Sequence, residues 1–221
     1  MAWLRRKYLI VGSALAAVVL VIGCGSSGEA GGSGGEPESV TSGSWVGVGD
    51  SWAIVWGEGD RGVVLAHGAA YDAASWESQG QALGENGVVA LAVEEISPGS
   101  LRLAIDYLRE EYDVESVALI GASAGTGPVL EVAEEDPEEV GQIMLLSGIG
   151  DVSGLGEYPK LFVASEGEEI SGRVHRMAEE APGGRNEALI LPGSAHAQAI
   201  FRTEEGDRLM QTILERLEEY D

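Results

Sequence analysis

Three kinds of side chain in the second half of the sequence have the types that nucleophilic catalysis requires. Ser123 lies within Gly121-Ala122-Ser123-Ala124-Gly125, which matches the pattern Gly-x-Ser-x-Gly. His196 comes later, and several carboxylates lie between the two. A hydroxyl whose proton is taken by a histidine can attack a carbonyl carbon and form a covalent intermediate. A serine, a histidine and a carboxylate that can act together indicate acyl-transfer chemistry.

The context of Ser123 matters more than the pattern, because glycine and serine are common in this chain. Gly31-Gly32-Ser33-Gly34-Gly35 matches the same pattern within a low-complexity segment. Ser123 instead follows the apolar run 117–120 and precedes a segment with helical spacing. A strand, a sharp turn and a helix form the setting in which such a serine is exposed above a sheet. We predict Ser123 as the nucleophile, with a structural turn serine as the alternative.

The chain has three histidines, and their positions predict different roles. His196 follows a late apolar run, so a loop beyond the last strand can bring it back toward Ser123 as the general base. His67 ends an early apolar run and precedes Ser123, and we predict that it is a structural loop residue. His175 is flanked by arginines and acids, which predicts a solvated helix residue.

Two backbone amides are predicted to stabilise the negative charge that develops on the attacked carbonyl oxygen. His67-Gly68 lies at the end of a predicted central strand, where open α/β sheets place their ligand crevice. Ala69 follows this pair, and Ala124 follows the predicted nucleophile. Backbone N–H donors leave the side chain free, so alanine suits both positions. We predict an oxyanion hole formed by Ala69 and Ala124.

The elements that must position these residues are indicated by short apolar runs. Runs without polar alternation are typical of strands buried on both faces, as in a parallel sheet covered by helices. Between them, 101–108 and 209–217 show the apolar spacing of a helix face. Alternating strands and helices predict an open, mostly parallel α/β sheet. The expected strands are 45–48, 52–56, 62–66, 88–93, 117–120, 143–146, 161–164 and 188–191.

Together these features resemble the α/β-hydrolase fold family. The resemblance covers about residues 45–221, and it implies attack by Ser123, proton transfer through His196, an acyl-enzyme intermediate and hydrolysis by water. It implies no metal and no organic cofactor. The matching segments are His67-Gly68-Ala69-Ala70, Gly121-Ala122-Ser123-Ala124-Gly125, Glu166-Gly167-Glu168-Glu169 and His196, in the order nucleophile, acid, histidine that the family has.

The family resemblance places the catalytic acid in the loop after the next-to-last predicted strand, and we predict Glu168. In relatives the acid usually comes a few residues past the strand end, which Glu168 fits. Glu166 and Glu169, its neighbours, remain alternatives. Asp151 is a further alternative, because some relatives carry the acid after the preceding strand.

Three features depart from the usual family pattern. Pro128 lies early in the predicted helix after the nucleophile, where proline is tolerated only in the first turn. The predicted acid is a glutamate, whereas the family more often has aspartate. Only residues 152–159 separate Asp151 from the next predicted strand, so no lid or cap domain fits there. A small, lidless form of the fold is expected.

The charge of the chain excludes one class of partner. Thirteen Lys and Arg residues face 37 Asp and Glu residues, and the net charge is −24. This excess repels phosphate backbones, so we expect no nucleic-acid partner. The 221 residues suffice for about one ordinary domain once a leader and a linker are set aside.

The N-terminal segment predicts export and a membrane tether. Residues 1–23 carry three basic residues and then an apolar stretch that is shorter than the ~20 residues of a spanning helix. Val21-Ile22-Gly23-Cys24 resembles the lipobox of bacterial lipoproteins, in which the cysteine receives a lipid. We predict a signal peptide at 1–23, a flexible linker at 24–44 and the α/β-hydrolase domain at 45–221. An uncleaved membrane anchor is the alternative.

We therefore expect an extracytoplasmic, lipid-anchored serine hydrolase that acts on small-molecule carboxylic esters. A lactone or amide hydrolase is an alternative, because it would carry the same residues on the same fold. A non-catalytic hydrolase-fold binding protein of the cell envelope is a second alternative. The third is an interaction module whose acidic surface is itself the functional feature.

Overall fold

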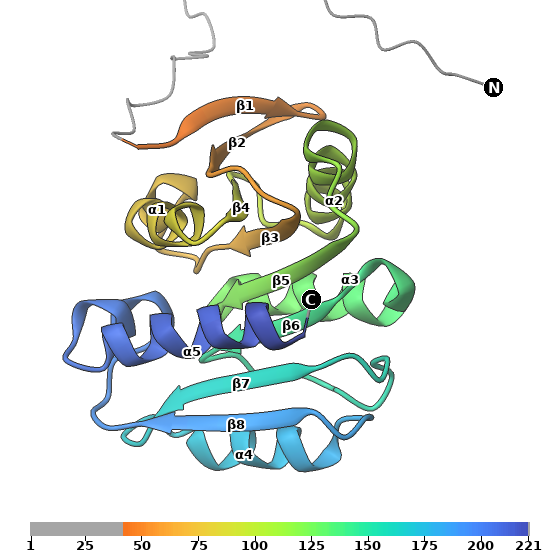
Figure 1. Cartoon of the computed structure of the whole chain (residues 1–221). Helices are drawn as coiled ribbons and strands as arrows, with labels where there is room; N and C mark the ends of the chain where they lie inside the picture. Colours follow the sequence, from red (N-terminus) through yellow and green to blue (C-terminus); the bar gives the residue numbers. More distant parts are fainter. Residues whose placement is uncertain (1–41, 221) are drawn as a thin grey trace, which may run out of the picture. The chain divides into compact units, whose positions relative to one another are not determined.

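Eight strands form one sheet in residues 42–220, the part of the chain that the computed structural model describes. The strands are β1 (Ser44–Val48), β2 (Ser51–Trp56), β3 (Arg61–Ala66), β4 (Val88–Val93), β5 (Ser116–Ala122), β6 (Gln142–Leu146), β7 (Lys160–Ser165) and β8 (Asn186–Leu191). Their order across the sheet is β1-β2-β4-β3-β5-β6-β7-β8, as Figure 1 shows from top to bottom. β2 runs antiparallel to both β1 and β4, and all the other neighbours are parallel.

The parallel register determines which residues meet at the carboxyl edge of the sheet. Ala66 of β3 is paired with Gly121 of β5, and Ala122 of β5 is paired with Leu146 of β6. Residues that directly follow these three strands are therefore brought together, although they are far apart in sequence. This edge is where open parallel sheets place their ligands.

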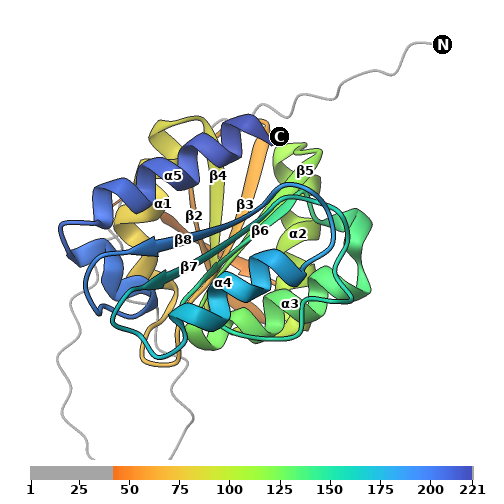
Figure 2. The ribbon, with the colours of Figure 1, turned by 90° about the horizontal axis from the view of Figure 1, so that it is seen from below.

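Helices cover both faces of the sheet. They are α1 (Glu77–Glu85), α2 (Pro98–Tyr112), α3 (Thr126–Glu135), α4 (Ser171–Glu180) and α5 (Gly206–Glu219), with short 3₁₀ helices η1 (Ala73–Trp76), η2 (Ser123–Gly125), η3 (Pro137–Glu139) and η4 (Ala197–Arg202). Figure 2 shows α1 and α5 on one side of the sheet and α2, α3 and α4 on the other. The start of α2 illustrates the local signals, because the side chain of Ser97 caps it and Pro98 occupies its first position.

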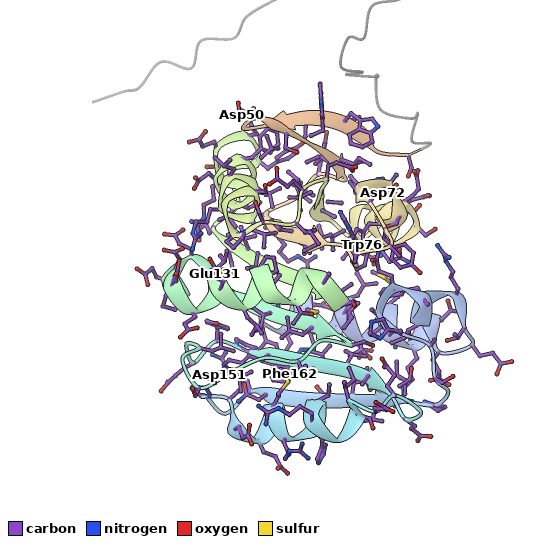
Figure 3. The ribbon with its side chains drawn as sticks, turned by 180° about the vertical axis from the view of Figure 1, so that it is seen from behind. Asp50, Asp72, Trp76, Glu131, Asp151 and Phe162 are labelled. Carbon is purple, nitrogen blue, oxygen red and sulfur yellow. The ribbon has the colours of Figure 1, made fainter. Side chains whose placement is uncertain are left out.

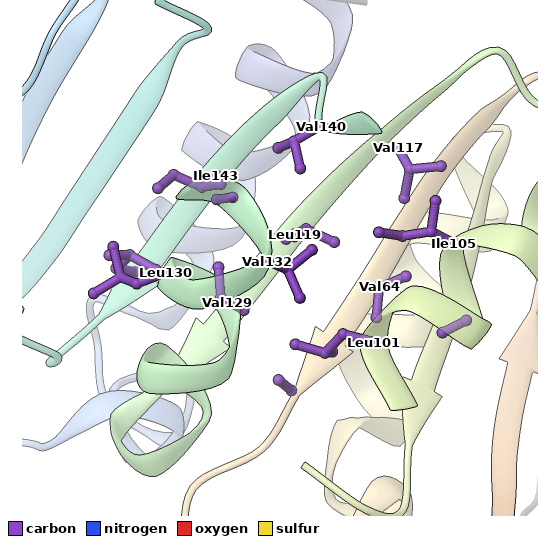
Figure 4. Close-up of a cluster of buried hydrophobic side chains, with 14 of the residues drawn as sticks. Val64, Leu101, Ile105, Val117, Leu119, Val129, Leu130, Val132, Val140 and Ile143 are labelled. Carbon is purple, nitrogen blue, oxygen red and sulfur yellow. The ribbon is translucent and has the colours of Figure 1, made fainter. Parts of the chain in front are cut away.

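Two apolar clusters, one on each face of the sheet, form the core. In β5, Val117 and Leu119 belong to the cluster under α2 and α3, whereas Ala118 and Ile120 belong to the other. Figure 4 shows the first cluster, in which Leu101 and other side chains of the two helices lie over the strands. Each fully buried Leu, Ile or Val side chain contributes about 1.5–3 kcal/mol. The core therefore fixes the strand ends that carry the polar residues.

The segment 147–159 joins β6 to β7 without a helix. Val152, Leu155 and Tyr158 of this segment are buried in the same cluster as residues of α3 and α4. The hydroxyl of Tyr158 donates a hydrogen bond of 2.8 Å to the carbonyl oxygen of Ala133 in α3. The segment takes the place of a covering helix, and residues 42–220 contain no inserted lid or cap domain.

The fold class predicted from the apolar runs is confirmed. All eight expected strands are present, with ends that differ by at most two residues, and the two expected helical stripes lie in α2 and α5. The predicted signal peptide at 1–23 and nearly all of the predicted linker lie outside the described residues.

Candidate active site

Ser123 lies at a sharp turn between β5 and α3. Its backbone has a φ of 50°, in the left-handed region that residues other than glycine rarely adopt. The strand ends at Ala122, and η2 leads from Ser123 directly into α3. The strained turn leaves Ser123 half-buried at the carboxyl edge of the sheet. Strain of this kind is typical of functional positions.

The two glycines of the Gly-x-Ser-x-Gly pattern are required by close backbone packing. A Cβ atom at Gly121 would lie 2.8 Å from the carbonyl oxygen of Gly125, and one at Gly125 would lie 2.5 Å from the carbonyl oxygen of Ala66. Their absence of side chains lets α3 begin against β3 and β5. Pro128 is the third residue of α3, within the first turn, where a missing N–H has no helical partner to lose.

His196 contacts both Ser123 and Glu168. Its Nε2 atom lies 2.8 Å from Oγ of Ser123, and its Nδ1 atom lies 2.7 Å from Oε1 of Glu168. The side chain of His196 is 55% exposed, whereas that of Glu168 is only 8% exposed. The structure thus brings the predicted nucleophile, base and acid into one continuous chain of contacts.

Uncharged donors hold the buried carboxylate of Glu168. Its Oε2 atom accepts hydrogen bonds from the hydroxyl of Ser147 at 2.8 Å and from the backbone N–H of Ser165 at 2.7 Å. A buried carboxylate is costly unless it is hydrogen-bonded. These two donors reduce that cost and leave Oε1 facing His196.

The other acids considered from the sequence lie elsewhere. Glu166 and Glu169 are exposed. Asp151, which lies on the segment between β6 and β7 (Figure 3), accepts hydrogen bonds from the backbone N–H and the hydroxyl of Ser153. These bonds lower the pKa of the exposed Asp151 carboxyl. Within residues 42–220, Glu168 is the carboxylate that His196 contacts.

Ser147 belongs to the site, although no sequence pattern reveals it. It directly follows β6, is buried and has a φ of 51°. Its hydroxyl donates to Glu168 and accepts a hydrogen bond of 2.8 Å from the backbone N–H of Ala197. Ser147 therefore joins the acid loop to the histidine segment. The one available signal is its place at the end of the run 143–146.

The predicted oxyanion donors lie on the two segments that flank Ser123. A Cβ atom built at Gly68 would lie 3.5 Å from Cβ of Ser123, so the loop after β3 packs against the serine. Ala69 is exposed on this loop, and its N–H donates to no acceptor within the described residues. Ala124 is exposed in η2, directly after Ser123.

The remaining histidines lie outside this chain of contacts. His67 is buried, and its ring nitrogens lie 2.8 Å from the carbonyl oxygen of Gly68 and 3.1 Å from that of Glu94. His175 is exposed on α4 beside Glu179. In residues 42–220, no group of three or more His, Cys, Asp or Glu side chains is arranged to hold a metal ion.

Comparisons with known proteins support the fold. No family model and no curated protein matches the sequence. The chain is similar to the structure of a dienelactone hydrolase from Anabaena variabilis, at 20% identity over 80% of this chain and 96% of that one, with a TM-score of 0.61. It is also similar to a monoacylglycerol lipase from Paleococcus ferrophilus, at 16% identity over 78% of this chain and 100% of that one, with a TM-score of 0.61. A third similar structure is a thermophilic carboxylesterase from a metagenomic library, at 13% identity over 79% of this chain and 87% of that one, with a TM-score of 0.64.

The sheet order and these likenesses define the class. The mostly parallel sheet, with its antiparallel β1–β2 hairpin at one edge and helices on both faces, is an α/β-hydrolase fold. At these identities the likeness shows the fold alone, and one fold carries many different activities.

Proposed function

We propose that this protein is a serine hydrolase that cleaves carboxylic esters through an acyl-enzyme intermediate. The observation that carries the proposal is the chain of contacts from Ser123 through His196 to Glu168, at 2.8 and 2.7 Å. A nucleophile, a base and an acid that orients the base form the arrangement that activates a serine. The similar structures named as a lipase and a carboxylesterase support the same reaction class.

In the acylation step, Oγ of Ser123 attacks the ester carbonyl carbon while Nε2 of His196 takes its proton. Glu168 accepts a hydrogen bond from the Nδ1–H of His196, which fixes the tautomer and stabilises the imidazolium. The carbonyl oxygen becomes an oxyanion that accepts hydrogen bonds from the N–H groups of Ala69 and Ala124. The carbon–oxygen bond to the alcohol then breaks, and the alcohol takes the proton from His196.

In the deacylation step, His196 takes a proton from water, and the hydroxide attacks the acyl carbon on Ser123. The same backbone N–H groups donate hydrogen bonds to the second oxyanion. When this intermediate collapses, the carboxylic acid leaves and His196 returns the proton to Ser123. The two steps balance with water as the only co-reactant.

The open site supports small, water-soluble esters as substrates. His196 is more than half exposed, and residues 42–220 contain no lid that would cover it. A lactone is the second candidate substrate, favoured by the likeness to a protein named dienelactone hydrolase. Ring opening would follow the same steps, with the alcohol still attached to the acyl group.

We also propose that a lipid on Cys24 holds the enzyme at a membrane outside the cytoplasm. The resemblance of Val21-Ile22-Gly23-Cys24 to a lipobox supports this location. These four residues lie outside the described part of the chain. Residues 24–44 would form a Gly- and Ser-rich spacer between the lipid and the domain at 45–221.

Hydrolysis of p-nitrophenyl esters of increasing acyl length, together with one lactone, tests the proposed function. We expect turnover that is fastest for short acyl chains and that falls by several orders of magnitude in Ser123→Ala. Faster opening of the lactone than of any ester would favour the second candidate. Absence of all hydrolysis, or full activity in Ser123→Ala, would contradict the proposal.

A further inference from the structure

Gln198 is a buried polar side chain that the proposed mechanism does not use. It lies in η4, two residues after His196. Its Oε1 atom accepts a hydrogen bond of 2.8 Å from the N–H of Gly68, and its Nε2 atom donates one of 2.8 Å to Oγ of Ser75. Gly68 is 130 residues away in sequence. Gln198 therefore connects the histidine segment to the loop that carries Ala69.

Ser75 determines which way the amide of Gln198 faces. Oγ of Ser75 lies 2.5 Å from the carbonyl oxygen of Asp72, which can only accept, so the Ser75 hydroxyl donates there. The Ser75 oxygen then accepts from the NH₂ group of Gln198, and Oε1 of Gln198 is left to accept from Gly68. The orientation of the amide thus follows from the hydrogen-bond network.

The contacts of Gly68 fix the peptide plane that bears the N–H of Ala69. The carbonyl oxygen of Gly68 accepts from the N–H of Tyr71 at 3.0 Å and lies 2.8 Å from Nδ1 of His67. The peptide is planar and trans, so the N–H of Ala69 points opposite to that carbonyl group. It therefore points away from both partners. Gln198 holds the preceding peptide through the N–H of Gly68.

We propose that Gln198 is a positioning residue for the oxyanion hole, and this role rests on the proposed serine-hydrolase function. It holds the Gly68 backbone so that the N–H of Ala69 faces the ester carbonyl oxygen. Because Gln198 and His196 lie on one short segment, that segment sets the base and the oxyanion donor relative to each other. Gln198 acts through the backbone of the loop.

The variant Gln198→Met tests this role, because it removes both hydrogen bonds and keeps a similar volume. We expect kcat to fall about 10- to 100-fold with KM changed less than about 2-fold, since oxyanion donors act most strongly in the transition state. The rate of labelling by a fluorophosphonate should fall in parallel, because its adduct places an oxygen in the oxyanion hole. Gln198→Glu retains an acceptor for Gly68 and should recover part of the loss.

Gln142 provides the matched control. It is a buried glutamine at the amino end of β6, and its Nε2 atom donates a hydrogen bond of 3.1 Å to the carbonyl oxygen of Arg216. Gln142→Met should lower stability with kcat unchanged. If Gln198→Met does not fold, Ser75→Ala removes the partner that orients Gln198 and should lower kcat several-fold.

The outcomes separate this role from the proposed function. Suppose that the wild type is active and reacts with the fluorophosphonate. A wild-type kcat in folded Gln198→Met would then overturn the positioning role alone. If Gln198→Met does not fold, a wild-type kcat in Ser75→Ala would do the same. An equal fall of kcat in Gln142→Met would also overturn it. A wild type that neither hydrolyses esters nor reacts with the fluorophosphonate would overturn the proposed function, and this role with it.

Discussion

Glu168 is a buried carboxylate held by uncharged donors. Two hydrogen bonds, from Ser147 and from the backbone of Ser165, satisfy one carboxylate oxygen, and the other oxygen faces His196 at 2.7 Å. When His196 becomes charged in the proposed reaction, the carboxylate lies directly beside the new charge. Glu168 itself is shielded from water, and this strengthens the attraction although His196 is half exposed. The proposed role of Glu168 therefore depends on its charge as well as on its hydrogen bond.

Replacing Glu168 by Gln tests that dependence. The amide keeps the shape but removes the charge and lets His196 adopt the wrong tautomer, so steady-state kinetics should show kcat lower by up to about 10⁴-fold. Glu166→Gln makes the same charge change on an exposed side chain of the same loop and should stay within about 2-fold of the wild type. Near-normal turnover in Glu168→Gln, with loss in Glu166→Gln or Asp151→Asn, would show that the acid is another residue.

The sequence predicts some residues of the site more clearly than others. Ser123 and His196 stand out because each follows an apolar run, and strand ends carry the reactive groups in this fold. The acid could be narrowed only to four carboxylates, since burial and the donors from Ser147 and Ser165 depend on tertiary packing. Gln198 could not be found from the sequence, because its partner Gly68 is 130 residues away.

Among the elements, the turn between β5 and α3 and the start of α3 contain two glycines, of which only Gly125 is sterically required. Gly125 lies where any Cβ atom would meet the backbone of Ala66 at 2.5 Å. Gly127, in the first turn of α3, would place a Cβ atom in open space, with nothing within 4 Å. The two positions separate a steric requirement for glycine from its effect on helix propensity.

Urea unfolding of Gly125→Ala and Gly127→Ala tests this distinction. We expect Gly125→Ala to lose about 1–3 kcal/mol of unfolding free energy, because the backbone must move to admit the methyl group. Gly127→Ala should be neutral or gain up to ~1 kcal/mol, because alanine favours the helix. Equal stability of the two variants would refute the steric role of Gly125.

Lys160 begins β7 and is fully buried at the amino end of the sheet. Its Nζ atom donates hydrogen bonds of 2.7 Å to the carbonyl oxygens of Tyr158 and Pro182. Burial, together with the charge of Arg185, lowers the pKa of Lys160 from 10.5 to about 8. The unfolded chain therefore holds this proton at pH values where the folded chain has released it.

The stability of the wild type relative to Lys160→Met should increase between about pH 8 and 10.5. In that window the unfolded state binds more protons than the folded state, so the free energy of unfolding rises with pH, by at most ~1.4 kcal/mol per unit. Urea unfolding of both proteins at pH 7, 8.5 and 10 measures this difference. A difference that stays constant or decreases would contradict the lowered pKa.

The elements are more predictable than their arrangement. The inner strands β3 to β7 show continuous apolar runs because both faces of the sheet are covered there. The insertion of β4 between β2 and β3, and the covering of one face by the segment 147–159, depend on packing between distant residues. The local spacing of apolar residues does not indicate which distant residues pack together.

At the scale of the whole molecule, the negative charge lies on the outside of the domain. Figure 3 shows acidic side chains such as Asp50 and Glu131 pointing outward, and both are exposed. None of the helices within residues 42–220 has the length and apolar character to cross a bilayer.

Replacing Cys24 by Ser tests the tether. Wild-type protein expressed in a bacterium should partition into detergent, and mass spectrometry should find a lipid-modified Cys24 at its N-terminus. The Cys24→Ser variant lacks the cysteine that would receive the lipid, so it should remain uncleaved or be released. Stable anchoring of the wild type requires more than one acyl chain. An unmodified Cys24 in mature wild-type protein would rule out the lipid anchor.

Covalent labelling by a fluorophosphonate, followed by peptide mass spectrometry, tests whether Ser123 is an activated nucleophile. Only a serine whose hydroxyl is activated reacts rapidly with this probe. We predict one adduct, on the peptide that contains Ser123, that is absent in Ser123→Ala and forms at least about 10²-fold more slowly in His196→Ala. No adduct on the wild type, or an adduct that persists in Ser123→Ala, would show that Ser123 is not the activated nucleophile.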